Sequence, residues 1–172
     1  MPRPADVQWA RIDWTHSANA KSSERSEEMM PEAQHQVTIA RPIGEVYAFV
    51  ADGLNGLKWR PGVLDISLVS GSGATAVYKQ GVKGPGGRRI DADYRITAYE
   101  PDHRLSFEAI AGPVRPTGSY VFEVIGGGTR LTFSLRADLG GIKKLLMSGA
   151  VQKTMDAEVA ATEQLKSILE TA

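Results

Sequence analysis

A long, one-sided helix near the end of the sequence constrains the fold more than any other feature. From Ala150 to Glu170, apolar residues recur at the spacing of one helical face, and most charged residues fall off that face. The mostly apolar face consists of Val151, Met155, Val159, Thr162, Leu165 and Leu169. At a rise of about 1.5 Å per residue, the helix would be roughly 30 Å long. It therefore needs a broad apolar surface to pack against.

The residues before this helix alternate between apolar and polar, which is typical of strands with one buried face. A first strand is predicted at 34–40, followed by two short helical segments at 43–51 and 54–59. The later strands are predicted at 63–70, 74–83, 88–99, 105–109, 120–124 and 131–135, with 88–99 the longest. Turns rich in glycine and proline join them, so we expect an antiparallel sheet. Residues 34–172 are thus predicted to form an α+β domain, in which a curved antiparallel sheet of about seven strands grips the C-terminal helix and encloses a binding cavity.

Two segments do not fit this pattern. Residues 1–33 are predicted to be a disordered or loosely docked extension, since 21–28 is nearly all Ser, Glu, Arg and Lys. Trp9 and Trp14 leave open that it is a short anchor that docks on the domain or on a partner. The segment Ile142–Met147 is expected either to belong to a helix that kinks near Ser148–Gly149 or to form a separate flap at the cavity mouth.

Composition excludes several classes of function. The 20 basic and 20 acidic residues give no net charge, so nothing indicates a nucleic-acid partner. The absence of cysteine excludes disulfides and thiolate chemistry. No apolar run is long enough to span a membrane, and we expect a cytoplasmic protein. The three histidines, His16, His35 and His103, show no metal-ligand or triad spacing, so we expect no metal and no cofactor. The sequence does not indicate the oligomeric state.

Several short motifs follow one another at characteristic spacing. They are the run Val37–Asp52 with Asn55, Trp59, Pro61 and Val63; Tyr99-Glu100-Pro101 with Arg104, Leu105 and Phe107; Gly128-Thr129 with Leu131; and Leu165-Lys166 with Leu169-Glu170. Together they resemble the START-like (SRPBCC) superfamily, and within it the polyketide cyclase/dehydrase branch. The resemblance covers 34–170. It implies a helix-grip fold with seven antiparallel strands, two short helices after strand one and a hydrophobic cavity under the last helix. Members of this superfamily include polyketide cyclases, lipid carriers, quinone-binding proteins, hormone receptors and chaperone activators, so the fold does not fix the activity.

Aromatic and methionine side chains are the predicted ligand-binding residues, because they suit an adaptable apolar pocket. They are Trp59, Tyr78, Tyr94, Phe107, Phe122, Met147 and Met155. Plain core packing is an equal alternative for these residues.

Glu158 lies within the apolar face of the long helix, so its carboxylate must pair with a cation or reach a wet cavity. Either this face is partly exposed, or Glu158 pairs with a strand arginine, or Glu158 faces the pocket as a polar anchor or proton acceptor. The last possibility makes Glu158 a weak catalytic candidate. Arg95, Arg115 and Arg136 are expected to be surface residues, as arginines usually are. They remain weak catalytic candidates, because one that faced inward could hold an enolate or carboxylate.

Three hypotheses follow. The first is binding of a small hydrophobic or aromatic molecule, such as a lipid or polyketide. The second is a polyketide cyclase/aromatase that uses acid–base groups of the pocket. The third is an accessory protein that docks partners through Ile142–Met147 and the exterior of the sheet and binds no ligand.

Overall fold

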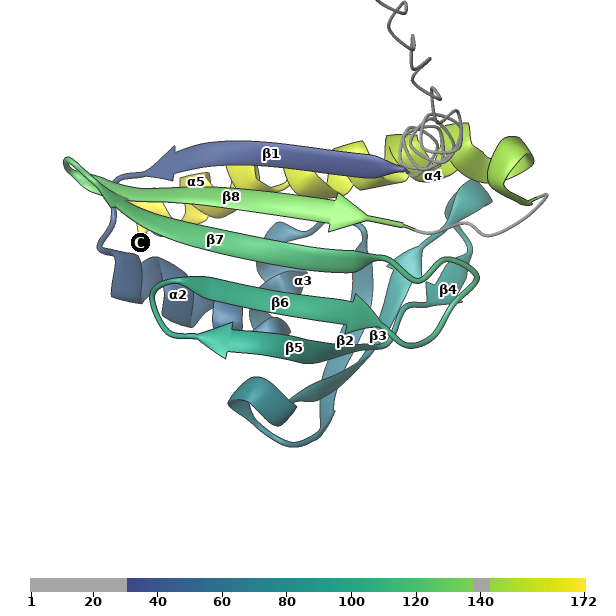
Figure 1. Ribbon diagram of the computed structural model, residues 1–172, viewed down its shortest axis with the longest axis horizontal. Helices are drawn as coiled ribbons and strands as arrows, with labels where there is room; N and C mark the ends of the chain where they lie inside the picture. The colour runs from purple at the N-terminus through teal and green to yellow at the C-terminus, as the bar shows by residue number, and fades with distance from the viewer. Residues whose placement is uncertain (1–30, 138–142) are drawn as a thin grey trace, which may run out of the picture.

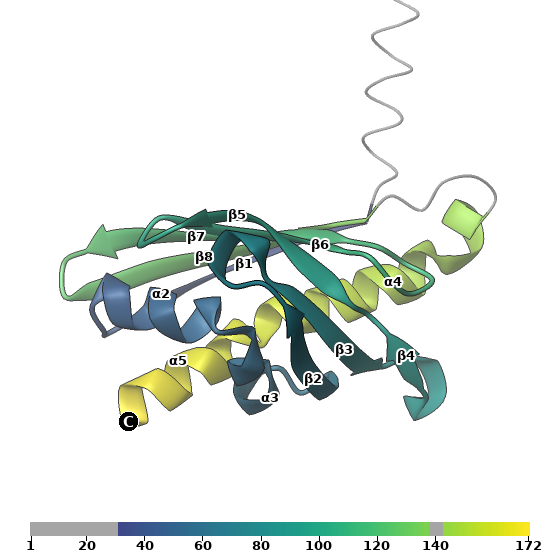
Figure 2. The same ribbon diagram turned by 90° about the horizontal axis from the view of Figure 1, so that it is seen from below.

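The computed structural model describes the backbone of residues 31–137 and 143–172, with the side chains of all of these except Pro85 and 143–148. Within these ranges, eight antiparallel strands form one sheet, and the α-helices lie on one of its faces (Figures 1 and 2). The strands are β1 (Glu32–Ile39), β2 (Val63–Ser70), β3 (Val77–Lys83), β4 (Arg89–Asp91), β5 (Tyr94–Glu100), β6 (Arg104–Ala109), β7 (Thr117–Ile125) and β8 (Gly128–Arg136). Their order is β1-β8-β7-β6-β5-β3-β2, with β4 paired to β3. The predicted α+β helix-grip architecture is confirmed.

The predicted strand 88–99 is wrong in one respect, because it is two strands in the structure. β4 pairs only with the end of β3, whereas β5 pairs with both β3 and β6. Asp93 lies at the interruption. Its side chain accepts a hydrogen bond from the backbone N–H of Gln80 (3.0 Å), and its carbonyl accepts one from Ile110 (2.7 Å). The Asp93 carboxylate thus accepts the hydrogen bond that a backbone carbonyl of a neighbouring strand would otherwise accept. The alternation of apolar residues in the sequence does not reveal such an interruption.

The strand predicted at 74–83 begins later, at Val77. The preceding residues form a 3₁₀ turn, η2 (Gly73–Thr75), in which Ser72 and Thr75 cap each other reciprocally. The loop between β3 and β4, which contains the turn η3 (Pro85–Gly87), closes a hairpin as expected.

Short helices follow β1, as predicted. They are α2 (Ile43–Ala51), the 3₁₀ turn η1 (Gly53–Asn55) and α3 (Gly56–Trp59). The carboxylate of Asp52 accepts a hydrogen bond from the backbone N–H of Leu54 (3.1 Å) and so starts η1. α3 ends at Trp59, just before Pro61 and Gly62.

The long helix consists of α4 (Lys143–Ala160) and α5 (Thr162–Thr171). α4 continues through Gly149, where the sequence predicted a kink or a separate segment, and the interruption lies at Ala161 instead. There the N–H of Ala161 bonds to the carbonyl of Glu158 (3.2 Å), three residues back, and the hydroxyl of Thr162 donates to the carbonyl of Val159 (2.8 Å). The regular helical hydrogen bonding is therefore interrupted at Ala161, while the apolar face continues from α4 into α5.

That apolar face forms the core against the sheet. Met155, Val159, Thr162, Leu165 and Leu169 are buried, and they face a set of buried residues on the sheet and α2. The largest fully buried side chains include Ile39, Val46, Phe122, Leu131, Phe133 and Leu165. The predicted packing of the long helix on the dry face of the sheet is confirmed.

Polar side chains of α5 cover the edge of the sheet at β1. Lys166 donates to the carbonyl of Thr38 (2.7 Å), Glu170 accepts from the N–H of Ala40 (2.7 Å), and His35 bonds to Glu163 (2.8 Å). β1 pairs with β8 on its other side. Backbone groups at an open edge can recruit other strands, so these contacts protect that edge.

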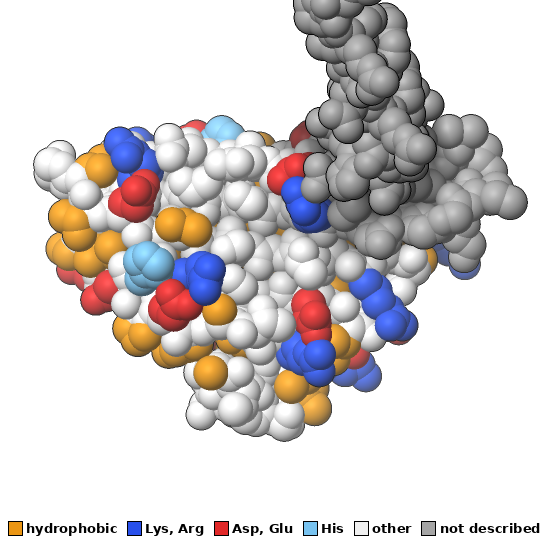
Figure 3. Space-filling view, viewed as in Figure 1, with side chains coloured by type: hydrophobic (Ala, Val, Ile, Leu, Met, Phe, Trp, Pro, Cys, Tyr) orange, Lys and Arg blue, Asp and Glu red, His pale blue; other side chains and the backbone are white. Residues whose placement is uncertain are grey.

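The outer face of the sheet carries charged side chains in pairs (Figure 3). They include Arg95–Glu108, Arg104–Glu100 and Arg130–Glu123. This is the wet face that the alternation predicted, and the site lies on the other side.

Candidate functional site

A cavity of about 170 Å³ lies between the sheet and the helices. Residues of α2, η1, α3, β3, the strands β5 to β8, the loop before β7, and α4 line it. Its lining is predominantly apolar. Two of its lining residues, Lys83 at the end of β3 and Thr154 on α4, are exposed, so the cavity reaches solvent between these elements.

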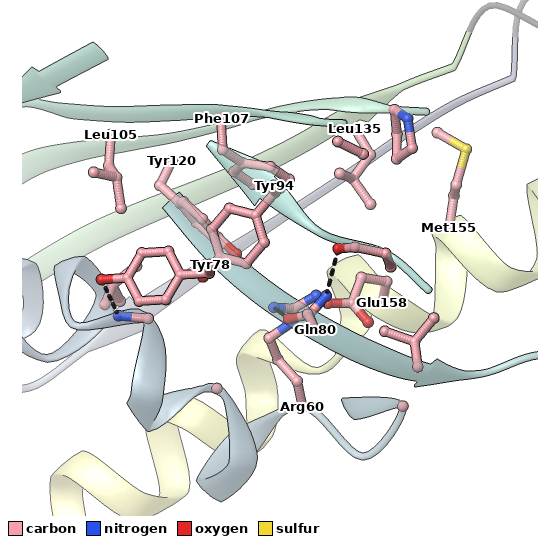
Figure 4. A pocket seen from close by; sticks show the side chains of 18 of the residues that line it. Arg60, Tyr78, Gln80, Tyr94, Leu105, Phe107, Tyr120, Leu135, Met155 and Glu158 are labelled. Atoms are coloured by element: carbon pink, nitrogen blue, oxygen red, sulfur yellow. Dashed lines mark hydrogen bonds and ion pairs between the residues drawn. The ribbon is translucent and has the colours of Figure 1, made fainter. Parts of the chain in front are cut away.

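Aromatic rings from adjacent strands form one wall (Figure 4). The ring of Tyr94 stacks on that of Tyr78 with centroids 5.0 Å apart, and it meets Phe107 edge-on at 5.5 Å. Tyr120 continues the wall, 5.9 Å from Phe107 and 6.3 Å from Trp59. The cluster follows from the sheet register, since β5 pairs with β6 and β6 with β7.

Gly53 makes room for this wall. A Cβ atom at this position would lie 2.4 Å from the hydroxyl oxygen of Tyr94 and 2.8 Å from the ring of Tyr78. Its backbone N–H donates to the hydroxyl of Tyr78 (3.3 Å), as Figure 4 shows. A glycine is therefore needed where η1 approaches the two rings.

Three polar side chains meet in the cavity from separate parts of the chain (Figure 4). Arg60 follows the last residue of α3, Gln80 lies on the inner face of β3, and Glu158 lies on α4. Nε of Arg60 donates to Oε1 of Glu158, and Nη1 donates to Oε1 of Gln80 (3.0 Å). The side chains of Arg60 and Glu158 are 12% and 18% exposed, so this is a largely buried ion pair.

Charge and burial fix the protonation of the surrounding groups. Burial disfavours the charge of Arg60, but Glu158 and its hydrogen bond outweigh this effect and raise the pKa of the guanidinium. Burial also raises the pKa of the Tyr94 and Tyr120 hydroxyls, and the nearby positive charge of Arg60 only partly opposes it. At neutral pH both tyrosines are therefore protonated hydrogen-bond donors.

Several of these groups keep unused hydrogen-bonding capacity. Nη2 of Arg60 and Oε2 of Glu158 form no hydrogen bond with another described residue, and neither do the hydroxyls of Tyr94 and Tyr120. The cavity thus offers one cationic donor, one carboxylate acceptor and two neutral hydroxyls to a guest.

The structure brings most predicted ligand-binding residues together. Those that line the cavity are Trp59, Tyr78, Tyr94, Phe107 and Met155. Phe122 does not line it, because its ring points into the core against Tyr47, with centroids 5.1 Å apart. The side chain of Met147 lies outside the described residues, as do those of the whole Ile142–Met147 segment and of Trp9 and Trp14.

Of the predicted polar residues, one lines the cavity and the others lie outside it. Glu158 lines the cavity, but its partner is Arg60 from the segment after α3 rather than a strand arginine. Arg95, Arg115 and Arg136 are exposed and line no part of the cavity, so they lie at the surface and none of them is the inward arginine of the alternative. Arg95 pairs with Glu108 on the outer face, because it alternates along β5 with the buried, inward-facing Tyr94.

Sequence reasoning missed Arg60 and Gln80. Gln80 shares the inner-face alternation of Ala76, Tyr78 and Val82, which was a usable signal. Arg60 lies between a helical turn and Pro61-Gly62, where no periodicity assigns a direction to a side chain.

The residues that the structure describes contain no group of three or more His, Cys, Asp or Glu residues that could hold a metal ion. None of the described helices combines the length and the hydropathy needed to cross a membrane.

The comparisons with known proteins agree with this geometry. A family model described as polyketide cyclase / dehydrase and lipid transport matches residues 30–169. No curated protein matches the chain significantly.

Many solved structures share the fold. A protein from Thermus thermophilus, TTHA0849, is 25% identical, with a TM-score of 0.69 over 82% of this chain and 98% of that one. The ZhuI aromatase/cyclase from Streptomyces sp. R1128 is 16% identical, with a TM-score of 0.65 over 81% and 96%. A START superfamily protein from Mycobacterium smegmatis is 12% identical, with a TM-score of 0.66 over 81% and 97%.

Proposed function

The chain belongs to the polyketide cyclase / dehydrase and lipid transport family, and on this premise we propose that it binds a small hydrophobic or aromatic molecule between the sheet and α4. The observation that carries this proposal is an apolar cavity with a single cluster of buried polar groups. Small-molecule sites typically combine apolar and aromatic walls with a few polar groups that fix orientation.

Native mass spectrometry of freshly purified protein tests the proposal. We expect a mass surplus from a bound apolar molecule, which is lost when the cavity is filled by Ala109→Phe. Ala109 lines the cavity at the end of β6. Thr97→Phe adds similar bulk on the exposed side of β5 and serves as the matched control. A wild-type protein that carries no ligand, and that no apolar compound stabilises against heat, would contradict the proposal.

A polyketide cyclase/aromatase activity is the second candidate, favoured by the unused donors and the carboxylate in one cavity. Arg60 and the hydroxyls of Tyr94 and Tyr120 could stabilise an enolate oxygen, and Glu158 could accept the proton removed from the adjacent carbon. The cavity volume of about 170 Å³ suits a compact guest better than an extended poly-β-keto chain, so binding is the leading proposal. For a cyclase, Arg60→Gln should abolish turnover of a poly-β-ketone while the fold survives.

A further inference from the structure

We propose that this cavity selects compact, uncharged ring compounds that carry a hydroxyl or carbonyl group, and that it discriminates against their anions. The inference rests on the proposed function, of which it names the ligand class. Three features of the cavity support it: its charge balance, its unused hydrogen-bonding atoms and its size.

The charges in the cavity cancel. The one buried cation among the described lining residues is Arg60, and it already pairs with the carboxylate of Glu158 while the amide of Gln80 accepts from the same guanidinium. An anionic ligand would either meet the Glu158 carboxylate at close range or have to displace it. It would also lose its hydration on entering an apolar cavity. An uncharged ligand incurs neither cost.

The remaining charged and titratable groups do not change this balance. Tyr94 and Tyr120 act on the ion pair from β5 and β7, and burial raises their pKa values. Tyr78 also lines the cavity, but its hydroxyl accepts a hydrogen bond from Gly53 instead. Lys83 lines the cavity only where it reaches the surface, and its side chain is exposed. An exposed ammonium is screened by water and adds little to the binding of an anion inside.

The atoms of Arg60 and Glu158 that form no hydrogen bond with a described residue favour a ligand that can both donate and accept a hydrogen bond. The pair is joined through Nε of Arg60 and Oε1 of Glu158, which leaves Nη2 and Oε2 without a hydrogen bond to any described residue. A ligand carbonyl can accept from Nη2, and a ligand hydroxyl can donate to Oε2. A hydroxyl serves both roles in turn, whereas a carboxylate or phenolate can only accept.

The size limits the buried part of the ligand to about one aromatic ring. The cavity measures about 170 Å³, and an engineered apolar cavity of about 150 Å³ in another protein binds benzene. The wall of Tyr78, Tyr94 and Phe107 presents ring faces and edges to such a guest.

4-Nitrophenol tests the inference, because it is a single ring that ionises near neutral pH and its phenol and phenolate forms differ in absorption. We expect the wild-type protein to convert phenolate into bound phenol. A neutral form that binds about tenfold more tightly raises the apparent pKa of the ligand by about one unit. Lys79→Gln, which removes a cation from the exposed face of β3, is the matched control and should show the same shift.

Glu158→Gln should reverse the preference, because it leaves the charge of Arg60 without a carboxylate partner. The phenolate should then bind more tightly than the phenol. If this variant does not fold, the absorption spectrum of 4-nitrophenol bound to the wild-type protein tests the inference without it. Bound phenolate in the wild-type protein would overturn the inference.

Different results would contradict the proposed function and the proposed ligand class. A ligand seen by native mass spectrometry, together with no binding of 4-nitrophenol, would overturn this inference and leave the proposed function standing. No ligand by native mass spectrometry, no binding of 4-nitrophenol and no stabilisation against heat by any apolar compound would together overturn both.

Discussion

Arg60 and Glu158 form an ion pair across the cavity although 98 positions separate them in the chain. One partner follows α3 and the other lies on α4, so the pair ties the short helices to the long one. The same contact thus joins α4 to the segment after α3 and supplies the buried charges of the cavity.

The first prediction concerns the contribution of this ion pair to the free energy of unfolding. Glu158→Gln should lower the free energy of unfolding by about 3 kcal/mol, because it leaves a largely buried guanidinium without its counter-charge. Urea unfolding followed by circular dichroism measures this loss.

Glu108→Gln is the matched control for this measurement. It breaks a pair whose side chains are 58% and 32% exposed, so the loss should stay below about 1 kcal/mol. Equal losses in the two variants would contradict the buried character of the Arg60–Glu158 pair.

The second prediction concerns the approach of η1 to the aromatic wall. Gly53→Ala should cost about 1–3 kcal/mol, because the new methyl group collides with the Tyr94 hydroxyl and the Tyr78 ring. It should also weaken ligand binding, since both rings must move. The unfolding midpoint and ligand titration measure the two effects.

Gly126→Ala is the control for this change. No atom lies within 4 Å of a Cβ built there and its backbone φ is not positive, so stability should change by less than about 0.5 kcal/mol. If Gly53→Ala were as neutral as Gly126→Ala, the close packing of η1 on Tyr78 and Tyr94 would be refuted.

The third prediction concerns Tyr47, whose buried hydroxyl has no hydrogen-bond partner among the described residues. Tyr47→Phe removes this unsatisfied group and should leave stability unchanged or raise it by up to about 1 kcal/mol. Tyr99→Phe, at a residue that is 37% exposed, provides the comparison. A loss of more than about 1 kcal/mol in Tyr47→Phe, on the order of a buried hydrogen bond, would show that this hydroxyl has a partner.

The same variant has a pH signature. Burial raises the pKa of Tyr47 to about 12, with smaller contributions from Tyr99, Asp102 and Glu100. A raised folded-state pKa means that stability is full below the ordinary tyrosine pKa of 10.0 and is lost as the pH rises from there toward 12. Tyr47→Phe should therefore lose less stability than the wild type over this range, as measured by thermal unfolding at each pH.

Regular periodicity explains which parts of the fold could be predicted. The inner-face residues of β8 and the apolar face of α4–α5 repeat at strand and helix spacing, and both face the core in the structure. The division between β4 and β5 could not be predicted in this way, because Asp93 ends the pairing through a hydrogen bond to Gln80, a residue on another strand. The break at Ala161 likewise depends on Thr162 bonding back to Val159, in a segment whose apolar spacing is unbroken.

The site was predictable only where it lies on regular elements. Tyr78, Tyr94, Met155 and Glu158 could be assigned to an inner face from spacing alone. Arg60 could not, since the segment that follows α3 has no period, and its direction depends on the carboxylate that it meets on α4.

One consequence concerns the order in which the chain is made. All eight strands and α3 precede α4 in the sequence, so a growing polypeptide carries Arg60 and the aromatic rings before the residues that close over them exist. Until Met155 and Glu158 have been added, Arg60 lacks the carboxylate with which it pairs, and the cavity lacks the side that α4 forms. A guest therefore finds the complete set of lining residues only after α4 has been added to the chain.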